Sequence, residues 1–194
     1  MKRVFILTCC LLLSCMSSFS QDKLPETFAD LLARAKMSFT TPKDYVETVI
    51  VENPHMNYDY AVKHPTEKFE VRYAVRPMDI QLRDYEKLIA DGATAIHPNN
   101  RFSSTVTATF LNIGGDMPDL GAFPDEAVKE EFNADKGVTG ICEARREFAG
   151  EYKYCMMVSL FRENMGTAFI FYMADDPAKI MEQIPLVFHA LIFE

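Results

Sequence analysis

The chain has 194 residues, of which 48% are hydrophobic and 25% are charged, and it contains only 8 Gly and 10 Pro. This composition excludes a fibrous or compositionally disordered protein and indicates a globular one. The formal net charge of -8 argues against binding to nucleic acid or to an anionic membrane surface, because both would repel the protein.

The first 20 residues have the order of an export signal. Lys2 and Arg3 precede the apolar run 4–13, which is too short to span a bilayer as a helix. The small-x-small pattern Ser18-Phe19-Ser20 predicts a signal peptide over residues 1–20 that is cleaved after Ser20. The mature chain would then begin at Gln21 and be periplasmic or secreted.

A second interpretation of the same segment stays open. Leu12-Leu13-Ser14-Cys15 resembles a bacterial lipobox, which would make Cys15 a lipidated N-terminal residue at the cell envelope. No later apolar run approaches 18 residues, so we expect no transmembrane segment in the mature chain.

The first part of the mature chain predicts a helix followed by three strands. Apolar residues recur at helical spacing in 25–37. Segments 45–51 and 57–63 are rich in Val, Thr and Tyr and predict strands separated by Asn53-Pro54. Residues 69–76 alternate apolar with mostly polar side chains, which predicts a half-buried strand with one face in water.

Helices are predicted in the middle of the chain. Residues 79–91 predict a helix that is closed by Gly92. Its inward-facing residues are expected to be Ile80, Tyr85, Leu88 and Ile89. Residues 100–113 fit either a helix or a strand, and we favour a helix because Gly114-Gly115 would end it. A further helix is predicted to begin at Phe123-Pro124 and to run to about residue 133.

The last third predicts an antiparallel meander and a closing helix. Segments 138–145, 152–161 and 167–173 read as strands joined by tight loops. The final helix begins at Asp175-Asp176-Pro177, with an apolar face that reaches Leu191 and a kink expected at Pro185.

Strands grouped in runs predict an α+β fold, with a mostly antiparallel sheet of about six strands packed by helices as an α/β/α sandwich. We expect one domain over residues 21–194. This element order, together with the entry Phe39-Thr40-Thr41-Pro42 to the first strand, resembles the PsbP-like family. The resemblance implies an accessory subunit rather than an enzyme. The Gln21 start and the aromatic-rich style are also similar to exported Bacteroidetes proteins.

The best candidate metal ligands are His55, Asp59 and His64. His55 and Asp59 lie four residues apart and would share one side of a strand, and His64 follows just beyond. Histidines beside a proline turn are more often plain surface residues, so we predict no metal and no other cofactor. His189 is interpreted as a partly buried, hydrogen-bonded side chain.

Cleavage after Ser20 would leave two cysteines, Cys142 and Cys155. Export places them in an oxidising compartment, and hairpin register would set them opposite each other. We therefore predict a disulfide between them, with buried free thiols as the alternative.

No nucleophile elbow, P-loop or dinucleotide fingerprint occurs in the sequence. The leading hypothesis is an exported, non-enzymatic envelope protein that binds a protein partner or a small ligand. The alternative is an envelope hydrolase with an unrecognised site. A structural subunit of a surface assembly is a third reading, which would show as a long unpaired edge strand.

Overall fold

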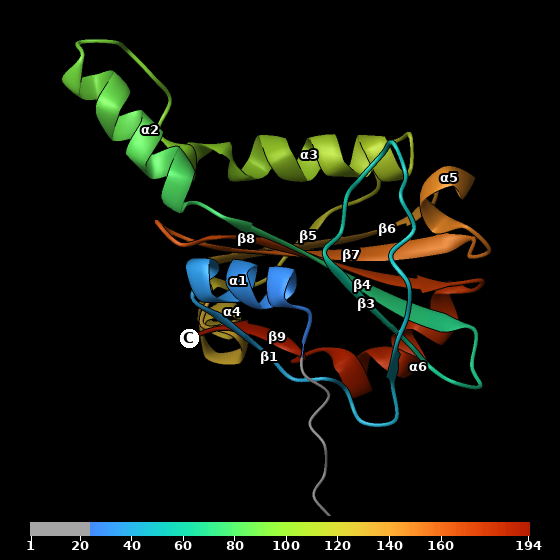
Figure 1. Cartoon of the computed structure of the whole chain (residues 1–194). Helices are drawn as coiled ribbons and strands as arrows, with labels where there is room; N and C mark the ends of the chain where they lie inside the picture. The colour runs from blue at the N-terminus through green and yellow to red at the C-terminus, as the bar shows by residue number, and fades with distance from the viewer. Residues whose placement is uncertain (1–23) are drawn as a thin grey trace, which may run out of the picture.

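Seven strands form one antiparallel sheet in the computed structural model, which describes residues 24–194 (Figure 1). In spatial order the strands are β2 (Val46–Glu47), β3 (Tyr60–Lys63), β4 (Phe69–Pro77), β8 (Gly166–Ala174), β7 (Tyr154–Arg162), β6 (Lys136–Glu143) and β5 (Gly121–Ala122). A separate two-stranded sheet pairs β1 (Met37–Phe39) with β9 (Leu191–Phe193). The predicted signal peptide, its cleavage site and Cys15 lie outside the described residues.

Helices cover both faces of the large sheet, which confirms the predicted α+β class (Figure 1). The helices are α1 (Glu26–Ala35), α2 (Asp79–Ala90), the 3-10 turn η1 (Pro98–Arg101), α3 (Phe102–Ile113), α4 (Asp125–Phe132), α5 (Arg146–Ala149) and α6 (Pro177–Val187). One face packs against α1, α4, α6 and the small sheet, and the other packs against α3 and α5. Within residues 24–194, no helix combines the length and apolar character needed to cross a membrane.

Two apolar clusters, one on each face, bury the central strands on both sides. The prediction that residues 69–76 keep one wet face is therefore wrong. Glu70 and Arg72, on the side expected to be in water, are only 8% and 3% exposed. Segments from elsewhere in the chain, including Tyr58 and Phe148, cover this face of β4.

Local sequence signals explain several boundaries. Residues 102–113 form a helix, as favoured, and the helix is followed directly by Gly114. Asp176 caps α6 because its side chain accepts a hydrogen bond of 2.8 Å from the N–H of Ala178. The helix ends at Val187, however, and Leu191 belongs to β9 rather than to the predicted apolar face of the helix.

Helix α2 projects away from the body of the protein (Figure 1). The helix itself and the left-handed Gly92 that follows it, with a φ of 82°, match the prediction, and the last helical residue is Ala90. Its inward face does not, because no residue of α2 is buried and Ile80, Leu88 and Ile89 are more than 40% exposed. The apolar period is present, but the contacts that α2 makes, such as the ring contact of Tyr85 with His97 and the packing of Leu82 against the core, leave most of it exposed.

The edges of the large sheet are short. Of the predicted strand 45–51, only Val46–Glu47 pairs with β3, and Val49 is 78% exposed. The other edge, β5, also has two residues. Because β5 pairs only with Val138 and Thr139, it covers part of the neighbouring strand β6.

Candidate functional site

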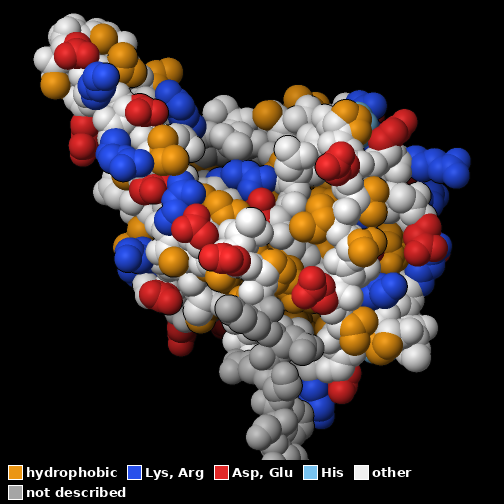
Figure 2. Space-filling model, in the orientation of Figure 1, with side chains coloured by type: hydrophobic (Ala, Val, Ile, Leu, Met, Phe, Trp, Pro, Cys, Tyr) orange, Lys and Arg blue, Asp and Glu red, His pale blue; other side chains and the backbone are white. Residues whose placement is uncertain are grey.

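A pocket of about 330 Å³ lies between the sheet and α3, at the base of the projecting helix α2. Its floor is apolar and includes Phe161 of β7 and Phe169 of β8, each only 1% exposed. Its mouth carries polar side chains, among them Arg76 and Arg101. Figure 2 shows basic side chains in the hollow where α2 leaves the body.

The local chain geometry fixes the mouth of this pocket. Strand β4 passes directly into α2 through Met78, whose N–H donates to the carbonyl of Met165 at 2.9 Å. The turn η1 is held to the β7–β8 hairpin by two hydrogen bonds between Asn99 and Asn164, of 3.1 and 3.0 Å. Arg101 ends η1, so these contacts position it at the mouth.

The two arginines differ in their partners. Arg76 donates to a carboxylate oxygen of Asp59 at 2.6 Å, which neutralises much of its charge. The exposed guanidinium of Arg101 makes no hydrogen bond or ion pair within residues 24–194. Arg101 ends η1, which runs directly into α3. The mouth of the pocket is therefore positive.

Hydroxyl and amide groups complete the polar lining. The hydroxyls of Thr105 and Thr109 donate to helix carbonyls at 2.8 Å, so towards the pocket they offer acceptor lone pairs. The hydroxyl of Thr167 and the amide of Gln81 have no hydrogen-bond partner in the described chain and can donate. The lining therefore combines a cation, a few free donors and an apolar floor.

The predicted metal candidates His55, Asp59 and His64 are not brought together. Nδ1 of His64 accepts from the backbone N–H of Glu67 at 2.9 Å. Asp59 accepts from the N–H of Val75 at 2.7 Å as well as from Arg76, and His55 lies outside β3 in a loop. Within residues 24–194, no group of three or more His, Cys, Asp or Glu side chains is arranged to hold a metal ion. Asp59 instead forms an ion pair with Arg76, which lines the pocket.

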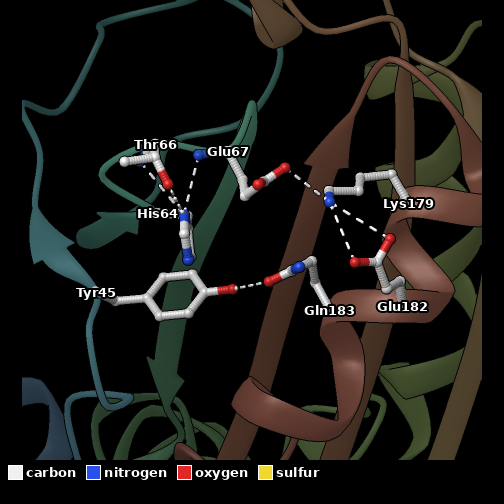
Figure 3. Close-up of polar contacts among 7 residues, drawn as sticks. All are labelled: Tyr45, His64, Thr66, Glu67, Lys179, Glu182 and Gln183. Atoms are coloured by element: carbon white, nitrogen blue, oxygen red, sulfur yellow. Dashed lines mark hydrogen bonds and ion pairs between the residues drawn. The ribbon is translucent and has the colours of Figure 1, made fainter.

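His64 belongs to a polar network that fastens the β3–β4 turn to α6 (Figure 3). Glu67 pairs with Lys179 at 2.7 Å, and the hydroxyl of Tyr45 donates to Gln183 at 2.8 Å. The ammonium of Lys179 lowers the pKa of Glu67, and burial raises the pKa of Tyr45 to about 12. The groups satisfy one another, so we interpret the network as structural.

Cys142 and Cys155 lie opposite each other in the β6–β7 register, as predicted. The predicted disulfide is not formed, because both residues are free cysteines. Sγ of Cys142 lies 3.8 Å from the carbonyl oxygen of Cys155 and contacts its backbone rather than its sulfur. Burial raises the pKa of both thiols. His189, interpreted as partly buried, is exposed and pairs with Glu131.

Arg101 is not among the site residues predicted from the sequence. One signal could have pointed to it: Arg101 is the only Asp, Glu, Lys or Arg between Asp91 and Asp116, so it is an isolated cation in an otherwise uncharged stretch. Comparison with family models, with curated proteins and with solved structures gives no match for the chain. The pocket must therefore be interpreted from its own chemistry.

Proposed function

We propose that this chain is an exported, non-enzymatic protein of the cell envelope that binds a small ligand in the pocket at the base of α2. The observation that supports the proposal is the pocket itself, in which an apolar floor meets a few convergent polar groups. Its 330 Å³ corresponds to about eleven water molecules of liquid volume, which is room for a ligand of about ten non-hydrogen atoms.

The chemistry of the lining favours binding over hydrolysis. The side chains that line the pocket are Arg, Gln, Thr, Met, Pro and Phe, and they offer no carboxylate or imidazole as a general base. We therefore keep the envelope hydrolase as an alternative without an observation in its favour. The resemblance to the PsbP-like family is part of the same proposal, since its members are mostly accessory subunits.

The export part of the proposal rests on residues 1–20. Mass spectrometry of the protein from the envelope of an expressing bacterium should give a chain that begins at Gln21. A diacylglyceryl mass on Cys15 would instead show a lipoprotein, and an intact Met1 would refute export by this signal.

The binding part can be tested by closing the pocket. Thr105 lines it, whereas the neighbouring Ser104 does not, and both side chains donate to the carbonyl of Arg101. Thr105→Phe places a ring in the pocket, and Ser104→Phe is the matched control that loses an equivalent hydrogen bond. A fragment library would be screened against the mature protein by saturation-transfer NMR.

Fragments that bind the wild type and Ser104→Phe should lose their signal with Thr105→Phe. A screen without hits, or hits that persist with Thr105→Phe, would contradict ligand binding in this pocket.

A further inference from the structure

We infer that the pocket selects a singly charged anionic amphiphile, with a carboxylate at the mouth beside Arg101 and an apolar chain or ring on the phenylalanine floor. This inference rests on the proposed function and names the chemical class of its ligand. Three independent features of the described chain support it.

The first feature is the charge of the lining. The protein has a net charge of -8, yet the charged residues among those that line the pocket are both arginines. Arg76 is paired with Asp59, which leaves one cation without a counter-ion. A carboxylate would supply that counter-ion, and charge-assisted bonds from a guanidinium to a carboxylate are among the strongest in proteins. One free cation suits a monoanion better than a phosphate dianion.

The second feature is the position of Arg101 before α3. Arg101 is the last residue of η1 and directly precedes α3, and its side chain is exposed. An anion bound at this point meets a cation whose backbone is held in place by the hydrogen bonds between Asn99 of η1 and Asn164 of the β7–β8 turn. The backbone that carries the cation is therefore already positioned before a ligand binds.

The third feature is that the inner part of the pocket is apolar and its rim is polar. The ring of Phe161 is stacked on that of Phe102 at 5.1 Å, and both are almost completely buried. Arg101 and Gln81 lie at the exposed rim. A ligand that satisfies both regions must be apolar at its inner end and anionic at its outer end. The Gln81 amide can add a hydrogen bond to the same carboxylate.

The test uses three probes that share one chain and differ in head group: octanoate, 1-octanol and octylammonium. Each has about ten non-hydrogen atoms, which matches the volume of the pocket. Binding to the mature protein would be measured by isothermal titration calorimetry at low salt. Octanoate should bind at least about tenfold more tightly than octanol, and octylammonium should bind most weakly.

Arg101→Gln removes the free cation and keeps a polar side chain. Arg83→Gln is the matched control, because Arg83 is an exposed cation of α2 that does not line the pocket. Arg101→Gln should weaken octanoate about tenfold or more and leave octanol within about twofold, whereas Arg83→Gln should leave both unchanged.

Equal affinities for octanoate and octanol, or an octanoate affinity that Arg101→Gln does not change, would overturn the inference. In that case, octanol binding that Thr105→Phe abolishes would still uphold the proposed function. If no octyl probe binds, the amphiphile class is wrong, and the fragment screen decides separately whether the pocket binds another ligand.

Discussion

Arg72, at the centre of β4, offers the sharpest test of how this fold is stabilised. The residue is 3% exposed, and its Nε donates to Glu70 at 2.5 Å. A second nitrogen donates to the carbonyl of Phe148, and the guanidinium lies 4.8 Å from the ring centroid of Tyr58. We predict that Arg72→Met is among the most destabilising single changes in the protein.

The magnitude follows from what the substitution leaves behind. Methionine keeps most of the apolar stem, but the carboxylate of Glu70, 8% exposed, loses its counter-ion. Breaking a buried ion pair by removing one partner costs about 3–5 kcal/mol. The carbonyl of Phe148 also loses a donor. We therefore expect a loss of about 4 kcal/mol in the free energy of unfolding, which for a domain of this size lowers Tm by about 8–16 °C.

The second variant separates this cause from simple loss of packing. Glu70→Leu combined with Arg72→Met removes both charges, and replacing a buried pair by apolar residues is often neutral or stabilising. The double variant should therefore be at least about 2 kcal/mol more stable than Arg72→Met alone.

Urea and thermal denaturation followed by circular dichroism would measure these differences. Arg34→Met is the control, because Arg34 pairs with Asp79 at the surface at 2.9 Å and should contribute about 1 kcal/mol or less. A penalty for Arg72→Met no larger than that of Arg34→Met, or a double variant no more stable than the single one, would refute this reasoning.

Three further predictions concern packing, pH and thiols. Gly166→Ala should destabilise by about 1–3 kcal/mol in urea denaturation, because its Cβ would lie 2.6 Å from a carbonyl oxygen of β4, whereas Gly121→Ala, with 3.5 Å to its nearest neighbour, should be close to neutral. Burial raises the pKa of Tyr45 to about 12, so its contribution to stability is complete below pH 10 and is lost as the pH rises towards 12. Over that range the free energy of unfolding of the wild type should fall by about 2–3 kcal/mol more than that of Tyr45→Phe. Parallel plots of stability against pH for the two proteins would contradict this. Burial raises the pKa of Cys142 to about 11 and that of Cys155 well above its usual value. The mature native protein should therefore react slowly with iodoacetamide at pH 8, and it should take up two alkyl groups once it is unfolded. No uptake after unfolding would show a disulfide that the structure lacks.

Signals within one segment predicted much of this fold. Helix α1 and the β6–β7–β8 meander follow from their own periodicity and turns, and the facing positions of Cys142 and Cys155 follow from hairpin register. Burial of Arg72 and Glu70 did not follow, because Tyr58 and Phe148, which cover that face, come from distant parts of the chain. An alternating pattern shows which side chains share a face, but it does not show what packs against that face.

For α2 the prediction was wrong in the opposite direction, because residues expected to face inward are exposed. Ile80, Leu88 and Ile89 have helical spacing, but the helix leaves the body and these three side chains stay more than 40% exposed. The pocket escaped prediction for a related reason, since β4, η1 and α3 meet only in three dimensions. Arg101 had no motif around it to mark it, and its lack of a counter-ion is a property of the folded protein.

The pairing of β1 with β9 has a consequence for how the chain folds. Met37, near the start of the described residues, lies opposite Phe193, which is 156 residues later. At synthesis rates of about 5–20 residues per second, the partner of β1 is made about 8–30 s after β1 itself. Until then, the small sheet beside α1 cannot form, and contacts of such long sequence separation also slow folding. The newly made chain therefore has an interval of many seconds in which its final core is still open.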